Sequence, residues 1–179
     1  MSMRAVFLDR DGVLNKAVVK GGKSYPPANE NDLEIYKEAP EAVAALQRAG
    51  YLTICVTNQP DVARGTRTQD EVLAMNLKVL RSLGLDDIFF CLHDDKDGCS
   101  CRKPKPGMLL AAAQKWGLNL SASWMVGDRK SDIAAGQAAG CRTVFINRSY
   151  AEGGHDGFPA DHVCFGVADA VSFILQTSL

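Results

Sequence analysis

The sequence has no apolar run near the roughly 18 residues needed to cross a bilayer, and it has no internal repeat or low-complexity segment. The first apolar stretch meets the charged residues Asp9, Arg10 and Asp11 too early to be a secretory signal peptide. Charge of one sign is also missing: 20 basic residues stand against 21 acidic ones, a net charge of -1. The chain therefore has no overall positive field to attract nucleic acid or an anionic membrane. We expect a cytoplasmic protein that binds neither.

Aromatic residues are few, at 7%, while 46% of the residues are hydrophobic and 23% are charged. This balance is typical of globular proteins and excludes a disordered chain, a collagen-like fibre and a coiled coil. A chain of 179 residues is long enough to bury about 70% of its unfolded surface. We expect one domain over residues 1–179, and we expect it to be a monomer.

Short apolar runs alternate with segments of helical periodicity along the chain. The runs predict strands over 4–8, 51–56, 87–91, 123–126, 142–146 and 162–165. The periodic segments predict helices over 41–49, 68–83, 106–116, 132–139 and 169–176. This alternation predicts an α/β fold, a three-layer Rossmann-like parallel sheet with helices on both faces. Residues 21–27 and 147–160 are expected to be loops, near the sheet edge where such folds bind ligands.

Two carboxylates, Asp9 and Asp11, follow the first predicted strand. In an extended chain, side chains two residues apart point the same way and lie about 6.5–7 Å apart. Such a pair repels unless a cation or a proton intervenes, and Mg²⁺ prefers oxygen ligands of this kind. Taken alone, the pair is equally well explained as an ordinary acidic turn.

Three further polar groups follow later strands. Thr57, Asn58 and Gln59 could hold phosphate oxygens, or they could simply cap a turn. Arg102 and Lys103 lie in a proline-rich loop and could neutralise a phosphoryl group, or they could be solvated.

The last strand-end group is Asp128, a candidate third carboxylate for a metal, with Asp132 one helical turn further on. Asp132 could cap the helix or hold a lysine. Because the carboxyl ends of parallel strands share one edge of the sheet, Asp9, Asp11, Thr57, Lys103 and Asp128 are expected to converge on one metal–phosphate site.

Four potential soft ligands lie within eleven positions: Cys91, His93, Cys99 and Cys101. Three sulfurs and one imidazole are the number and type of ligands in a closed tetrahedral Zn²⁺ site. Unligated thiols are the alternative, and a redox role is less favoured. We predict a structural zinc ion that orders the loop and thereby fixes Arg102 and Lys103, the next residues along the chain.

The four strand-end groups resemble, in order and type, the four motifs of the haloacid dehalogenase superfamily of phosphatases. The resemblance is greatest to the branch that contains histidinol-phosphate and heptose-bisphosphate phosphatases, and it covers about residues 4–147. It is carried by Phe7-Leu8-Asp9-Arg10-Asp11-Gly12-Val13-Leu14-Asn15, Thr57-Asn58-Gln59 with Ala63-Arg64-Gly65, Cys91-x-His93 with Cys99-x-Cys101-Arg102-Lys103-Pro104, and Gly127-Asp128 with Asp132.

The resemblance implies a role for each site residue. Asp9 would attack phosphorus and form an aspartyl-phosphate, and Asp11 would protonate the leaving oxygen and then activate water. Mg²⁺ would be held by the Asp9 carboxylate, the Asp11 backbone carbonyl and Asp128. The residues implied to bind a small phosphorylated sugar are Asp9, Arg10, Asp11, Thr57, Asn58, Gln59, Arg102 and Lys103. The expected reaction is removal of the C7 phosphate of a heptose 1,7-bisphosphate on the route to surface-glycan heptose.

Three departures from the family pattern concern the surroundings of the site. Pro60-Asp61 stands where the family usually has Ser-Gly, residues 16–25 are longer and richer in Gly and Lys than expected, and the segment between His93 and Cys99 is short. No cap domain fits between the first two motifs, so the site is expected to be open and bordered by the zinc loop.

Other functions remain open at this point. Histidinol phosphate or another small sugar phosphate could be the substrate, because the same motifs serve those reactions. A nucleic-acid 3′-phosphatase is disfavoured by the near-neutral charge and by the lack of a basic, aromatic strip. A catalytically inactive, zinc-stabilised binding module is the alternative from a different class.

Overall fold

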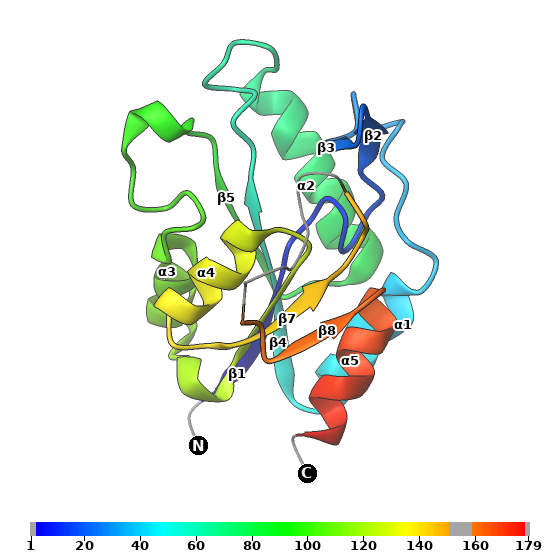
Figure 1. Ribbon diagram of the computed structural model, residues 1–179, viewed down its shortest axis with the longest axis vertical. Helices are drawn as coiled ribbons and strands as arrows, with labels where there is room; N and C mark the ends of the chain where they lie inside the picture. Colours follow the sequence, from blue (N-terminus) through cyan, green and yellow to red (C-terminus); the bar gives the residue numbers. More distant parts are fainter. Residues whose placement is uncertain (1–2, 151–158, 178–179) are drawn as a thin grey trace.

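The computed structural model describes residues 3–150 and 159–177, which form a six-stranded parallel sheet in the order β5-β4-β1-β6-β7-β8 (Figure 1). The strands are β1 (Arg4–Leu8), β4 (Tyr51–Asn58), β5 (Asp87–Cys91), β6 (Trp124–Gly127), β7 (Arg142–Ile146) and β8 (His162–Cys164). The helices are α1 (Ala39–Arg48), α2 (Gln69–Leu83), α3 (Gly107–Trp116), α4 (Lys130–Ala138) and α5 (Val167–Gln176). The predicted α/β fold is confirmed, including the bounds of β5 and β7.

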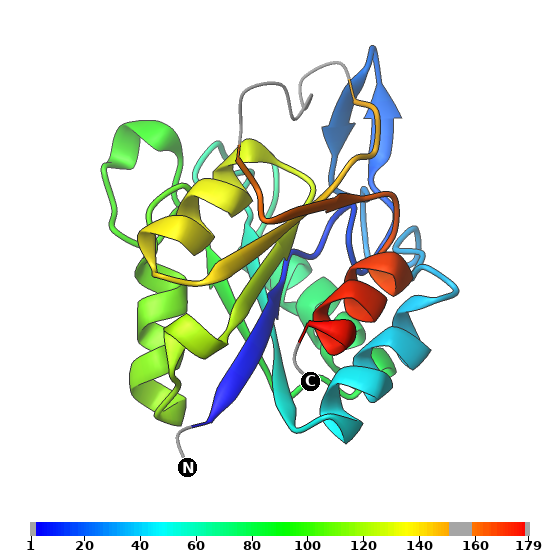
Figure 2. The same cartoon turned by 60° about the horizontal axis from the view of Figure 1, so that its bottom comes forward.

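The central strand β1 is buried on both faces because its successive side chains point to opposite sides of the sheet. Val6 and Leu8 belong to the apolar cluster that contains the buried faces of α1, α2 and α5. Ala5 and Phe7 belong to the cluster beneath α3 and α4. The sheet is therefore the middle of three layers, with the two helical layers on either side of it in Figure 2.

A β-hairpin stands at the carboxyl end of the sheet, formed by β2 (Val18–Lys20) and β3 (Lys23–Tyr25). The prediction of a loop over 21–27 is wrong for β3. Gly21 and Gly22 have φ angles of +58° and +76°, as a two-residue hairpin turn requires. The strands escaped prediction because each has only three residues and the side chains of β2 are exposed. In Figure 2 the hairpin projects beyond the ends of the strands.

The strand β4 continues two residues past its predicted end, because Thr57 and Asn58 pair with Phe90 and Cys91 of β5. Both polar residues therefore sit on the last rungs of the sheet. Residues 151–158 of the predicted loop over 147–160 lie outside the described residues. Two short 3₁₀ helices, η1 (Asp95–Asp97) and η2 (Leu120–Ala122), complete the elements. In the part of the chain that the structure describes, no helix is long and apolar enough to cross a membrane.

Candidate active site

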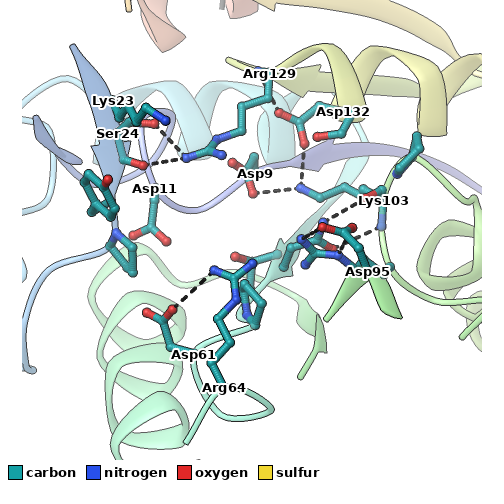
Figure 3. Close-up of a pocket in the computed structure, with 18 residues that line it drawn as sticks. Asp9, Asp11, Lys23, Ser24, Asp61, Arg64, Asp95, Lys103, Arg129 and Asp132 are labelled. Atoms are coloured by element: carbon teal, nitrogen blue, oxygen red, sulfur yellow. Dashed lines mark hydrogen bonds and ion pairs between the residues drawn. The ribbon is translucent and has the colours of Figure 1, made fainter. Parts of the chain in front are cut away.

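A cleft of about 520 Å³ opens at the carboxyl end of the sheet (Figure 3). Asp9 and Asp11 reach it from the end of β1, Thr57 and Asn58 from the end of β4, and Arg102 and Lys103 from the loop after β5. The hairpin forms one wall of the cleft. The loop of residues 91–101, called the zinc loop below, contributes to the opposite wall through Asp95. The structure thus brings the predicted strand-end residues to one place.

Lys103 lies at the centre of a buried charge cluster. Its Nζ is 2.8 Å from Asp9 Oδ1 and 2.7 Å from Asp132 Oδ1, and it donates to the Val56 carbonyl oxygen at 2.7 Å. Asp132 also accepts a hydrogen bond from the Arg129 main-chain N–H at 2.9 Å. The two alternatives for Asp132, capping a helix and holding a lysine, are therefore both true.

Burial raises the pKa of Asp9 to about 6, and the charges of Asp132 and Asp11 act in the same direction while Lys103 opposes them. Burial alone would lower the pKa of Lys103, but the neighbouring carboxylates of Asp132 and Asp9 raise it above its ordinary value. A cation fixed between two carboxylates is well placed to neutralise an incoming phosphoryl group.

Asp11 lies in a different environment. Its carboxylate accepts hydrogen bonds from Arg10, with Nη2 to Oδ2 at 2.9 Å, from Asn15 Nδ2 at 3.0 Å and from Gln59 Nε2 at 2.9 Å. Burial would raise its pKa, but Arg10 and these hydrogen bonds lower the pKa below its ordinary value. The pKa of Asp9 is thus raised and the pKa of Asp11 is lowered. Such a difference is found in pairs of carboxylates that divide acid–base and nucleophilic tasks.

Asp128 is buried, and no hydrogen bond of good geometry from the described residues reaches its carboxylate oxygens, although the Tyr150 hydroxyl interacts with this carboxylate. Burial and the charges of Asp9 and Asp132 raise its pKa well above the ordinary value. A methyl group on Gly12 would lie 1.9 Å from Asp128 Oδ2, so only glycine permits this approach.

Carboxylate oxygens of Asp9, Asp128 and Asp132 lie within 4.8 Å of one another. Unpaired buried carboxylates are costly unless a cation balances them, and a set of close oxygens suits a hard divalent ion. The residues present therefore fit Mg²⁺. The Asp11 carboxylate is not part of this group, and a contribution from the Asp11 backbone carbonyl stays a prediction.

Arg10, Asn58 and Gln59 were predicted to bind substrate, and the structure gives each of them protein partners. Asn58 exchanges two hydrogen bonds with the backbone of Lys103, at 2.9 and 3.1 Å. Gln59 donates to Thr57 Oγ1 at 2.9 Å, and the buried Arg10 donates to Asn76 at 2.8 Å. Arg10 and Gln59 are not among the described residues that line the cleft. All three support the reactive groups, and their direct contact with substrate stays a prediction.

The four predicted zinc ligands lie together at the base of the zinc loop, with their ligand atoms within 4.8 Å of one another. The sulfur–sulfur distances are 3.7 Å for Cys91–Cys99, 3.2 Å for Cys91–Cys101 and 3.5 Å for Cys99–Cys101. His93 Nδ1 is 3.5 and 3.4 Å from the sulfurs of Cys91 and Cys101. Zinc–sulfur bonds of about 2.3 Å in a tetrahedron imply sulfur–sulfur distances of about 3.8 Å. The donor set and its spacing therefore fit Zn²⁺.

Sequence reasoning missed several residues that line the cleft, among them Arg129 and Asp95. Arg129 donates from Nη2 to the carbonyl oxygen and the hydroxyl of Ser24, at 2.8 and 2.7 Å, and so ties the hairpin to the start of α4. Asp95 accepts from Arg102 Nε at 2.7 Å. The position of Arg129 directly after Asp128 was the one signal for it, whereas a partner 105 residues away leaves no trace in the sequence.

Comparison with known proteins gives a consistent result. A family model described as haloacid dehalogenase-like hydrolase matches residues 25–140. A D-glycero-beta-D-manno-heptose-1,7-bisphosphate 7-phosphatase of Vibrio cholerae is 37% identical over 161 residues, covering 83% of each chain. The enzyme of the same name from Helicobacter pylori is 38% identical over 139 residues, covering 74% of this chain and 77% of the relative.

Solved structures agree with the sequence relatives. The D,D-heptose 1,7-bisphosphate phosphatase of B. bronchiseptica, complexed with magnesium and phosphate, superposes with a TM-score of 0.83. It is 30% identical and the match covers 98% of this chain and 99% of that one. A HAD-like phosphatase from Mesorhizobium loti has a TM-score of 0.75 at 28% identity, covering 98% and 87% of the two chains.

Proposed function

Because this chain belongs to the haloacid dehalogenase-like hydrolases, we propose that it is a Mg²⁺-dependent phosphatase that removes the C7 phosphate of D-glycero-D-manno-heptose 1,7-bisphosphate. The names of its relatives and of a solved structure with the same fold support this substrate. The observation that best supports phosphoryl transfer is the ion pair between Lys103 and Asp9. Both residues line the cleft together with Thr57 and Asp11.

The first half of the reaction belongs to Asp9. An oxygen of its carboxylate attacks phosphorus, the new O–P bond forms an aspartyl-phosphate, and the bond from phosphorus to the C7 oxygen breaks. Lys103 and the Thr57 hydroxyl bind the phosphoryl oxygens and offset their charge during the transfer. Asp132 holds Lys103 in place throughout.

The second task is proton transfer by Asp11, which gives a proton to the leaving sugar oxygen and then takes one from the attacking water. The water oxygen bonds to phosphorus, inorganic phosphate leaves and the Asp9 carboxylate is restored. The lowered pKa of Asp11 suits the base half of this cycle. For the acid half, its carboxyl group must take up a proton and turn from Arg10 toward the cleft.

The two metal ions have separate tasks. Mg²⁺ would be held by Asp9, Asp128 and the backbone carbonyl of Asp11, and it would supply positive charge beside the transferring phosphoryl group. Zn²⁺ would be held by Cys91, His93, Cys99 and Cys101 and would fold the zinc loop. The buried carboxylate of Asp128 and the close packing of the four zinc ligands support these assignments.

A bisphosphate substrate needs a cation for the phosphate that is not transferred. Arg102 lines the cleft beside Lys103, and Lys23 and Arg129 line it from the hairpin side. We assign the anchoring of the second phosphate to Arg102, because its planar guanidinium can bind a phosphate through two hydrogen bonds.

The setting of the reaction follows from the same assignment. None of the six cysteines forms a disulfide, which is typical of a reducing compartment, and we place the enzyme in the cytoplasm. There it would act as a monomer on a small sugar phosphate and supply heptose for surface glycans, with no role for nucleic acid or membranes.

The decisive experiment measures phosphate release, with Mg²⁺ present, from heptose 1,7-bisphosphate, histidinol phosphate and a panel of sugar monophosphates. We expect kcat/KM to favour the heptose bisphosphate by about 100-fold or more, which is about 2.7 kcal/mol of transition-state binding. A flat profile would contradict the proposed substrate but leave the phosphatase mechanism standing. No release from any substrate would contradict both.

A further inference from the structure

The loop that follows β4 reaches both walls of the cleft. On one side Arg67 Nη2 donates to the Pro27 carbonyl oxygen at 2.7 Å, at the foot of the hairpin. On the other side Arg64 makes two hydrogen bonds to Asp94 of the zinc loop, from Nε to Oδ2 at 3.0 Å and from Nη2 to Oδ1 at 2.9 Å. A bidentate arginine–carboxylate pair fixes direction as well as distance.

The contacts continue from Asp94 to Arg102. Asp94 accepts a hydrogen bond from the main-chain N–H of Asp95 at 2.8 Å, at the start of η1. The Asp95 carboxylate in turn accepts from Arg102 Nε at 2.7 Å, and Arg102 Nη1 lies 3.4 Å from the His93 carbonyl oxygen. Arg64 therefore holds Asp94, and Arg102 holds the next residue, Asp95.

We propose that Arg64 is a positioning residue, which holds the Asp94–Asp95 segment so that the Arg102 guanidinium faces the substrate's second phosphate. The role rests on the proposed function, because it concerns the anchoring of a bisphosphate. Zinc would fix Arg102 through the chain that follows Cys101, and Arg64 fixes Asp94, the residue next to the Asp95 carboxylate that Arg102 contacts. Both supports are needed because the Asp95 side chain is 77% exposed and has no packing to hold it.

Arg64 itself also lines the cleft (Figure 3), with Nη1 3.8 Å from Asp61 Oδ1. A direct contact between Arg64 and substrate is therefore the competing explanation for any loss on mutation. The two explanations differ in whether the effect of Arg64 depends on Asp94.

A double-mutant cycle separates the two explanations. We expect R64A to raise KM for heptose 1,7-bisphosphate about fivefold, the upper range for an exposed ion pair, with kcat and the KM for heptose 7-phosphate unchanged. D94A is expected to have the same effect, and R64A/D94A is expected to be no worse than either single variant. R64K keeps the charge but not the two-pronged bond and is expected to restore little. If the two effects add in the double variant, Arg64 acts independently of Asp94 and the proposal is wrong.

A second readout needs no substrate. Arg102 has a side chain only 15% exposed, and we expect R64A to speed its modification by phenylglyoxal, followed by peptide mass spectrometry, about fivefold. An unchanged rate would overturn the proposal even if the bisphosphate proved not to be the substrate. A wild-type enzyme that ignores the bisphosphate would instead overturn the proposed function alone.

The matched control is R48A, which removes an arginine from an exposed ion pair with Glu41. Arg48 ends α1 just before β4 begins at Tyr51, so it lies at the opposite end of the sheet from the cleft. We expect R48A to leave KM and the Arg102 modification rate unchanged, and zinc content to be the same in all variants. Zinc loss in R64A would show damage to the loop itself and would also contradict the proposed role.

Discussion

The floor and the walls of the cleft are built in different ways. The floor consists of Asp9, Thr57, Lys103, Asp128 and Asp132, none more than 6% exposed. The walls are the hairpin and the zinc loop, where Val19 and Tyr25 are 55% and 45% exposed. The floor is formed by the ends of strands and a helix above the main core, whereas the walls depend on polar contacts and on four clustered residues that could hold a metal ion.

This difference separates chemistry from selection. A phosphoryl transfer needs charges held in fixed positions without water, which burial and mutual pairing provide. Substrate choice depends on protein groups that contact the part of the substrate remote from the transferred phosphate. Exposed loops can supply these groups without disturbing the core. The substitutions predicted below alter either a residue of the floor or a contact that holds a wall. We expect the first kind to lower turnover and the second kind to change mainly KM or substrate preference.

The largest effect is expected from D9N, which removes the carboxylate that we propose as the nucleophile. Its turnover should fall by about 10⁴-fold or more, as in other enzymes that lose the attacking group. Because the amide keeps the size of the carboxylate, the melting temperature and zinc content should stay near those of the wild type. Residual activity above one hundredth of the wild type would contradict the role of Asp9.

Loss of zinc is expected to have a smaller effect. C101S, or removal of zinc by a zinc-selective chelator with Mg²⁺ kept in excess, should lower kcat/KM for the bisphosphate by about tenfold, the usual scale when the support of a site residue is lost. The far-UV circular dichroism should change little, since the sheet and its helices lie outside the loop. C141S, which alters a buried thiol away from the loop, is the control. Global unfolding on chelation would show that the loop and the core are one unit.

Release of the hairpin should cost less again. R129A removes two hydrogen bonds to Ser24, each worth about 1 kcal/mol at most, and we expect KM to rise about fivefold with kcat little changed. S24A removes only the side-chain acceptor and should have a smaller effect in the same direction. A fall in kcat larger than the rise in KM would instead connect Arg129 to the floor.

The smallest effect is expected from D61N. Its carboxylate lines the cleft and repels an anionic substrate, so the amide should lower KM by about twofold, the scale of one exposed charge interaction. D70N, on an exposed position of α2, should change nothing. A higher KM in D61N would mean that the carboxylate holds Arg64 in place rather than opposing the substrate.

Most of the floor could be predicted from sequence because Asp9, Thr57 and Asp128 each come at the end of an apolar strand. Buried parallel strands are continuous apolar runs, and their carboxyl ends must share one edge of the sheet, so Asp9, Thr57 and Asp128 could be placed together. The clustering of Cys91, His93, Cys99 and Cys101 could be predicted because they are close in sequence and chemically distinctive.

The walls could not be predicted to the same extent. Their contacts join residues far apart in sequence, such as Arg129 with Ser24 and Arg64 with Asp94, and exposed polar groups carry no periodic signal. The hairpin was missed because three-residue strands with exposed side chains lack hydrophobic alternation, although Gly21-Gly22 is itself a turn signal. Arg10 and Gln59 show a further limit, because the sequence places them beside the site but does not tell which way they point.

The most direct test of the division between floor and walls compares R102A on heptose 1,7-bisphosphate and heptose 7-phosphate. The two substrates share the phosphate that is transferred and differ only in the second one. We predict that kcat/KM for the bisphosphate falls at least about tenfold, the loss expected for a two-pronged charged hydrogen bond, while the monophosphate is hydrolysed as before. An equal loss with both substrates would contradict the division, because Arg102 would then serve the chemistry.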